Sequence, residues 1–509
     1  MKRRIHLILG AATAFAALCV AFSAQAQAPD PLSGLSGAIE SMRDGRFSEA
    51  GESFSRLASG DPQDPVSPLL EGMSLWWRTL TGGGSVTPEL VEGRFAEAAR
   101  RARAMAAAGD TEARSRALTF LGISLMFEAR SRAARGAAFS AGSPAREGHR
   151  ALSEALKLSP DNPDALFAMG AYNYYADNVG VLVKGLRALL LIPGGDEELG
   201  IRQLERAGDR SLLFGTESLL LLSHIFSGAF EEDFRRADGY LLRATRRHER
   251  SPLLALLRAD LLYRLGRLSE AETLARHAGE LAQGPSDAQV RMTLEAAYRR
   301  AASLLAQRRA EESLEVIEAA LTGLPPVEPE ARQRWSVLIA ATARETGEID
   351  RARAALSALG TGVSAPSIGA DGVTPRRRRS GESSPTSNAR RAAALRLDAA
   401  GRRSEALEEL ARLSSDQPAD ARVAYDMGRL LQRDGRSIEA RRHLELAARS
   451  ELAEVAGWAL LRLGWDREIH GSRAEALPYY RKAGELKRFA FKDAAKDRVR
   501  YPTSIEPES

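Results

Sequence analysis

Apolar residues recur every three or four positions along most of the chain, with charged residues between them. In the segment 437–448, for example, Ala440, Leu444 and Ala447 are spaced so that they lie on one face of a helix. No segment shows a sustained alternation of apolar and polar residues with period two, which is the pattern of a half-buried strand. The pattern therefore predicts an all-α fold with essentially no sheet.

A short motif, in which glycine is followed by glutamate and alanine, recurs in the last third of the chain. It begins at Gly401, Gly435 and Gly471, so successive copies are 34 and 36 residues apart. A period near 34 residues is typical of helix–turn–helix repeats. We expect Gly435 to end the first helix of its repeat in the left-handed conformation, which glycine adopts without strain.

Two further glycines, Gly428 and Gly464, lie inside the predicted first helices of consecutive repeats. A glycine within a helix costs ~1 kcal/mol relative to alanine. Its presence at the same position of two repeats therefore predicts that the first helix approaches the second very closely there. The small side chain of Ala440 on the second helix allows the same close approach.

These segments resemble the tetratricopeptide repeat (TPR), in which a large residue and Leu-Gly on the first helix are followed by Gly, Ala, a large residue and Ala. In 457–490 the matching residues are Leu460, Leu463, Gly464, Gly471, Ala476, Tyr480 and Ala483. The resemblance extends more loosely from about residue 31 to about residue 490. Longer or irregular helices are expected in 65–150 and 171–245. The resemblance implies a TPR-like α-solenoid, a right-handed superhelix of antiparallel helix pairs.

Residues 361–388 differ in composition from the rest of the chain. They are rich in Gly, Ser, Pro and Thr and contain the run Arg376, Arg377, Arg378 and Arg379. This composition is typical of a disordered linker. It would divide the chain into an N-terminal array, 29–360, and a C-terminal array, 389–500. The four arginines are either a weak contact site for an anionic polymer or lipid, or simply part of a solvated linker.

The first 26 residues have the features of a signal peptide. Basic residues precede an apolar run from Ile5 to Phe22, and Ala24 and Ala26 provide the small residues that signal peptidase requires. We therefore expect an exported protein, periplasmic or associated with the cell envelope; the alternative is an uncleaved anchor helix. The chain's one cysteine, Cys19, follows Leu18 rather than a small residue, so a lipoprotein is not expected.

The charge of the chain gives little support to nucleic-acid binding. The formal net charge is +5. It falls to +2 without the three basic residues of the signal, and to −2 when the four linker arginines are also set aside. Nucleic-acid binding would require a basic face on the folded part of the protein, so no nucleic-acid partner is expected.

No motif of a metal, cofactor or catalytic site is recognisable. The seven histidines are too far apart in sequence for two of them to bind one metal from adjacent helix turns, and the mature chain has no cysteine. The segment from Pro193 to Leu199 superficially resembles the Gly-Gly-Asp-Glu-Phe motif of diguanylate cyclases. We interpret it instead as a turn after which Asp196 caps a helix. The expectation is a protein that is not an enzyme and has no cofactor.

The resemblance also implies where a partner would bind, because first-helix positions line the concave groove of a TPR array. Aromatic residues and arginine at such positions are typical of binding hot spots. The candidates are Arg422, Tyr425, Arg429, Trp458, Leu461 and Trp465 in the C-terminal array and Phe167, Tyr174 and Tyr175 in the N-terminal array. Alternatively, the tryptophans cover the end of the array and the tyrosines pack helix pairs.

The function expected from these features is that of a scaffold. It would bind a protein or peptide partner in the concave groove, and envelope or export assembly is the expected setting by analogy with other exported TPR proteins. The alternative is an enzyme built on a helical superhelix that acts on a cell-wall or polysaccharide substrate. In that case a pair of catalytic carboxyl groups would have to lie within the array.

Overall fold

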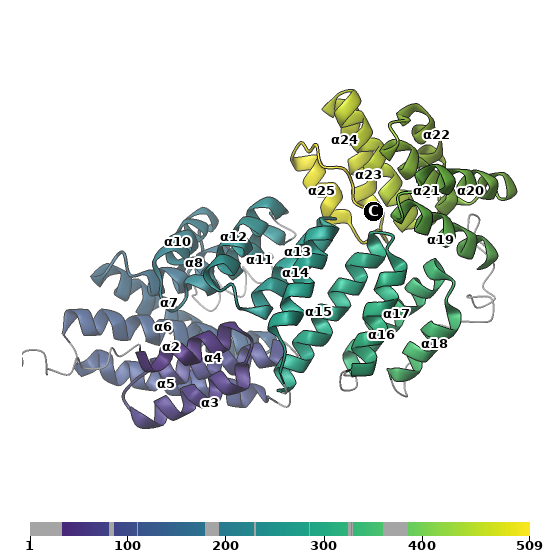
Figure 1. The fold of residues 1–509 in the computed structure, drawn as a ribbon. Coiled ribbons are helices and arrows are strands. Elements are labelled where there is room, and N and C mark those ends of the chain that lie inside the picture. Colours follow the sequence, from purple (N-terminus) through teal and green to yellow (C-terminus); the bar gives the residue numbers. More distant parts are fainter. Residues whose placement is uncertain are drawn as a thin grey trace, which may run out of the picture. The chain divides into compact units, whose positions relative to one another are not determined.

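The computed structural model describes residues 33–80, 86–108, 110–178, 193–228, 231–284, 286–323, 327, 329–359 and 385–509. Helices are the only regular elements among these residues, so the predicted all-α fold is confirmed for this part of the chain (Figure 1). The predicted signal peptide and the run Arg376–Arg379 lie outside the described residues.

The described residues form two compact units, unit 1 up to Pro160 and unit 2 from Asp161 onward. The helices of unit 1 are α2 (Ser33–Arg43), α3 (Phe47–Gly60), α4 (Val66–Leu80), α5 (Pro88–Ala108), α6 (Thr111–Ala134) and α7 (Ala138–Leu158). Those of unit 2 are α8 (Pro163–Asp177), α10 (Glu197–Arg210), α11 (Gly215–Ser227), α12 (Phe234–Arg247), α13 (Pro252–Arg264), α14 (Leu268–Leu281), α15 (Asp287–Ala306), α16 (Ala310–Gly323), α17 (Pro329–Thr346), α18 (Ile349–Ala358), α19 (Pro385–Ala399), α20 (Arg403–Asp416), α21 (Ala421–Arg433), α22 (Ser437–Ala448), α23 (Ala453–His470), α24 (Arg473–Glu485) and α25 (Lys492–Arg500).

Unit 1 contains the long helices that were expected in 65–150. Helices α5, α6 and α7 have 21, 24 and 21 residues. Helices α6 and α7 pack closely because Gly122 of α6 has no side chain: a Cβ there would lie 2.4 Å from the side chain of Leu152. Phe54 and Phe95 are buried in the core of this unit.

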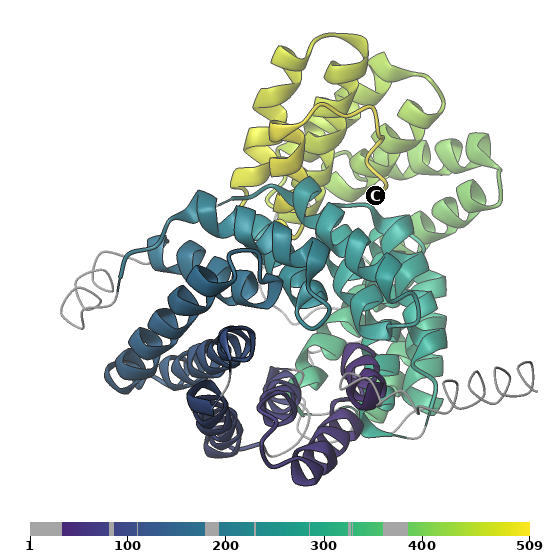
Figure 2. The same ribbon diagram turned by 90° about the vertical axis from the view of Figure 1, so that its left-hand side faces the viewer.

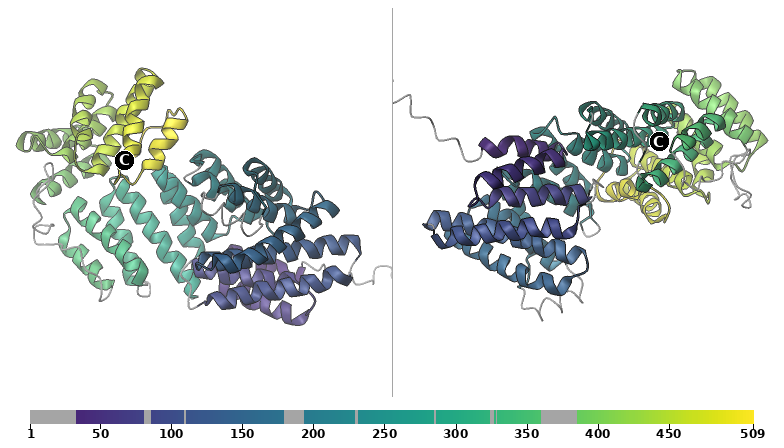
Figure 3. Two further views of the ribbon diagram at one scale, coloured as in Figure 1. Left: turned by 180° about the vertical axis from the view of Figure 1, so that it is seen from behind. Right: turned by 90° about the horizontal axis from the view of Figure 1, so that it is seen from below.

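Unit 2 shows the helix-pair packing that the TPR resemblance implies, with successive helices side by side (Figure 3). A Cβ on Gly428 of α21 would lie 2.6 Å from Leu444 of α22, and one on Gly464 of α23 would lie 2.4 Å from the ring of Tyr480 in α24. The close approach predicted at both glycines is therefore confirmed. The left-handed backbone predicted at Gly435 is confirmed by its φ of 77°.

The turn before α10 also has the predicted form. The Asp196 side chain accepts a hydrogen bond of 2.8 Å from the backbone N–H of Leu199, as expected for a helix cap. A Cβ on Gly195 would lie 2.1 Å from the carbonyl oxygen of Asn173. The glycine is thus required because the turn lies directly against α8.

The C-terminal repeats belong to the same compact unit as residues 161–359. Helix α19 begins at Pro385, inside the segment predicted as a linker, and it contacts α17. Helix α25 contacts α12 and α13, where Arg264 pairs with Asp493 at 2.6 Å. That 361–388 separates two independent arrays stays a prediction, since most of this segment lies outside the described residues.

Two further features concern membranes and metals. Among the described helices, none combines the length and the apolar content needed to cross a bilayer. The same part of the chain brings together no group of three side chains that could bind a metal ion.

Candidate functional site

Residues 502–509, here called the tail, follow α25 without regular secondary structure. Figure 2 shows the yellow end of the chain running from α25 across the C-terminal helices. Its backbone carbonyls accept hydrogen bonds from a row of side chains, here called the tail site. Arg235 donates to Pro502 at 3.2 Å, Trp465 to Ser504 at 3.2 Å, Arg498 to Ile505 at 3.0 Å, Arg462 to Pro507 at 2.7 Å and to Ser509 at 2.8 Å, and Tyr425 to Ser509 at 2.7 Å.

Arg462 of α23 is the centre of the tail site. Only 2% of its side chain is exposed, and it forms an ion pair of 2.8 Å with Glu506 of the tail. Its acceptors within the repeats are neutral oxygens of Gln432 and Tyr425, both at 3.2 Å. A buried guanidinium is costly unless a carboxylate balances its charge. The tail therefore supplies the carboxylate that this arginine needs.

A second carboxylate of the tail contacts a helix N-terminus. Glu508 accepts a hydrogen bond of 2.5 Å from the backbone N–H of Ser269, in the first turn of α14. The unpaired N–H groups and the helix dipole favour negative charge at this position. The two acidic side chains of the tail, Glu506 and Glu508, are thus both held by positive groups of unit 2.

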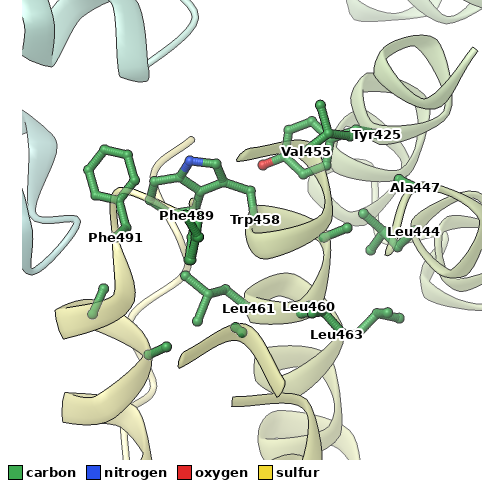
Figure 4. Close-up of a cluster of buried hydrophobic side chains, with 14 of the residues drawn as sticks. Tyr425, Leu444, Ala447, Val455, Trp458, Leu460, Leu461, Leu463, Phe489 and Phe491 are labelled. Atoms are coloured by element: carbon green, nitrogen blue, oxygen red, sulfur yellow. The ribbon is translucent and has the colours of Figure 1, made fainter. Parts of the chain in front are cut away.

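Of the predicted groove residues, Tyr425 and Trp465 are brought to the tail. Trp458 and Leu461 are instead buried in an apolar cluster (Figure 4). The Trp458 ring lies 4.6 Å from that of Phe491, between ring centres, and 5.8 Å from that of Phe489. In this conformation these two residues pack the repeats together and present no open surface to a partner.

Arg422 and Arg429 lie in a cluster of buried charges. Arg422 pairs with Glu345 at 3.2 Å, and Arg429 lies 4.0 Å from Asp426. Burial lowers the pKa of both guanidinium groups. At the centre of this cluster is Arg391, which pairs with Asp426 at 2.7 Å and also with Glu345. The cluster joins α17, α19 and α21.

The N-terminal candidates are mostly packing residues. Phe167 is buried and stacks on Phe214 with 5.1 Å between ring centres. Tyr174 is buried in an edge contact with Tyr175, and burial raises its pKa. Tyr175 is 36% exposed. That any of these residues binds a partner stays a prediction.

Three residues of the tail site were not predicted from the sequence: Arg462, Arg235 and Arg498. A usable signal was present for the first of them. Arg462 follows Trp458 by four residues and precedes Trp465 by three, so helical spacing places it on the same side of α23 as the two tryptophans. The tail itself lies beyond residue 500, where the predicted array ends.

Unit 1 contains a separate cleft that the sequence did not indicate. Its volume is about 740 Å³. Arg101 on its wall is fixed by hydrogen bonds to the carbonyls of Ala58 at 3.0 Å, Asp61 at 2.9 Å and Asp64 at 3.2 Å. The other lining residues are Leu35, Leu57, Pro62, Gln63, Pro65, Val66, Ser67, Arg100, Ala104, Met105, Arg116 and Phe120. The cleft is thus partly apolar and partly charged, with arginines as well as Asp61 and Asp64 in its lining.

Lowering the pH is expected to destabilise unit 2 through Glu345. Burial by itself would raise the pKa of this carboxyl group, but Arg391, Arg422 and Arg308 together lower the pKa below its ordinary value of 4.5. The folded protein then binds fewer protons than the unfolded chain. The stabilisation is therefore fully present above about pH 4.5 and is lost as the pH falls through the folded-state pKa.

The variant Glu345→Gln tests this pH dependence, because glutamine has no ionisable group at this position. Urea denaturation between about pH 6 and about pH 3 should show a smaller decrease in its free energy of unfolding than in that of the unmodified protein. The same decrease in both proteins would contradict the assignment.

Comparisons with known proteins find similarity only among solved structures. No model of a known protein family matches the sequence, and no curated protein matches it. The TPR domain of P58(IPK) shares 17% identity over 81% of this chain and 95% of its own length, with a TM-score of 0.23. The C-terminal part of a TPR repeat-containing protein from Cytophaga hutchinsonii shares 12% identity over 58% of this chain and 97% of its own length, with a TM-score of 0.29. Yeast Tom70 shares 11% identity over 93% of each chain, with a TM-score of 0.29. The chain is similar to these structures at scores too low for any property of theirs to be transferred to it.

Proposed function

We propose that this chain is an exported scaffold that binds an extended segment of a protein partner at the tail site of its C-terminal repeats. The observation that carries the proposal is the way the site holds residues 502–509. Its donors reach backbone oxygens of a segment that has no regular secondary structure, and such bonds can be made to any segment of suitable shape. Arginine and aromatic side chains, which dominate binding energies at interfaces, make up most of the site.

The location outside the cytoplasm rests on the first 26 residues alone, with their basic start, apolar run and small residues at the expected cleavage point. Fractionation of cells that express a tagged copy, followed by mass spectrometry of its N-terminus, tests this part of the proposal. We expect a mature protein that starts just after Ala26 or Ala28. A full-length chain in the cytoplasm would contradict it.

The partner is sought by crosslinking in cells. A photo-crosslinking amino acid is placed at Trp465, which touches the tail, and in a matched protein at Ile438, which is 74% exposed on α22. We expect Trp465 to capture a protein partner that Ile438 does not capture. Capture of the same proteins from both positions, or of none from Trp465, would argue against a binding role for the tail site.

A further inference from the structure

We infer that the tail is a built-in occupant of the tail site, and that the partner is an extended acidic segment that displaces it. This inference rests on the proposed function, because it concerns the same site. Residues 502–509 already make the contacts that an external ligand would make. A partner therefore binds by competition rather than at an empty surface.

The chemistry of the partner follows from which tail groups are recognised. Most hydrogen bonds of the site go to backbone carbonyls, which every peptide has. The recognised side chains are the carboxylates of Glu506, at Arg462, and Glu508, at the start of α14. One residue, Pro507, separates them, and proline favours an extended backbone at the residue before it. The site thus selects an extended segment with two acidic residues separated by one position.

The burial of Arg462 explains why an occupant of the site has to be acidic. With the tail in place this side chain is 2% exposed. A neutral occupant would leave its charge buried against the neutral oxygens of Gln432 and Tyr425. A buried charge without a counter-charge is strongly unfavourable. An acidic segment from a partner restores the ion pair, whereas a neutral segment does not.

Tethering makes the tail a strong competitor. A segment attached to its own site by a short connection has an effective concentration on the order of millimolar. For a free peptide with a dissociation constant on the order of 10 μM, such competition would weaken apparent binding on the order of 100-fold. Release of the tail is therefore expected to raise the apparent affinity for an acidic peptide by one to two orders of magnitude.

The test uses the full chain and a fluorescent peptide with the sequence of residues 501–509. In the variant Glu506→Arg, Glu508→Arg, the tail can still accept hydrogen bonds through the backbone oxygens of Pro507 and Ser509. It now places positive charges opposite Arg462 and the start of α14, and the repeats are unchanged. Fluorescence anisotropy should show the peptide binding this variant at least ~10-fold more tightly than the unmodified chain. A second peptide with arginine at both glutamate positions should bind neither protein.

The matched control is Glu451→Arg, Glu485→Arg, which makes the same change of charge at two exposed positions away from the tail. It should bind the peptide as weakly as the unmodified chain. Equal binding to the tail variant and to this control would overturn the inference. So would the absence of binding to a tail variant whose circular dichroism and melting temperature are unchanged.

Hydrogen exchange gives a second measurement that requires no substitution. In the unmodified protein the backbone N–H of Thr503 donates to Glu468 at 3.4 Å. An excess of the acidic peptide should speed exchange at this N–H, and the arginine-containing peptide should not. Unchanged exchange at a saturating concentration of the acidic peptide would show that the peptide does not displace the tail.

If displacement occurs but crosslinking at Trp465 captures no partner, the inference stands and the proposed function fails. If a partner is captured and the peptide does not displace the tail, the proposed function stands and this inference fails.

Discussion

Replacement of Arg391 by alanine is expected to lower the free energy of unfolding of unit 2 by about 3–5 kcal/mol. The Arg391 side chain is fully buried between Asp426, which is also fully buried, and Glu345. Its removal leaves two carboxylates without their main counter-charge. Two other arginines offset only part of the loss. Arg422 lies 3.2 Å from Glu345, and Arg308 lies 3.4 Å from Glu345 and 3.9 Å from Asp426.

Urea denaturation followed by tryptophan fluorescence measures this effect, since Trp335, Trp458 and Trp465 all lie in unit 2. The control is Arg402→Ala, which removes an exposed ion pair with Glu405 one helix turn away. That variant should unfold at the same urea concentration as the unmodified protein. A similar midpoint for Arg391→Ala would show that the buried cluster contributes little to stability.

The parts of the fold that depend on neighbouring residues could be predicted from the sequence. Gly435 must end a helix in the left-handed region, and Asp196 must cap one, because both effects act within a single turn of chain. The close helix approach at Gly428 and Gly464 could be predicted for a related reason. Their position within the repeat places them opposite the second helix of the same pair, at Leu444 and Tyr480, each 16 residues further along the chain.

The site was harder to predict because its contacts join distant residues. Arg391 could pair with any of the many acidic residues of the chain, and only the folded structure selects Glu345 and Asp426. The tail shows no hydrophobic periodicity. The groups that bind it include the side chain of Arg235 and the backbone N–H of Ser269, both far away in sequence. Composition likewise gives no sign of the boundary after Pro160, since helices of similar character lie on both sides of it.

Trp458 and Trp465 were both predicted as groove residues, and substitution by alanine is expected to separate their roles. Trp458→Ala should lower the free energy of unfolding of unit 2 by about 3–5 kcal/mol, as is usual for a buried aromatic residue. Its ring is 4% exposed and packs against Phe491. It also lies against the turn at Gly266, where a Cβ would be 3.1 Å from the ring. Loss of the ring would therefore loosen the contact of α23 with α25 and with the end of α13.

Trp465→Ala should have little effect on stability but should weaken the hold on the tail. The residue is partly exposed, and its indole N–H donates one hydrogen bond to the tail, which is worth about 0.5–1.5 kcal/mol. We expect a urea midpoint close to that of the unmodified protein but faster hydrogen exchange at the backbone N–H of Thr503, which donates to Glu468. If Trp458→Ala instead unfolds normally and frees the tail, Trp458 belongs to the tail site. The apolar cluster would then have to be held together by Phe489 and Phe491, which pack against each other at 5.9 Å between ring centres.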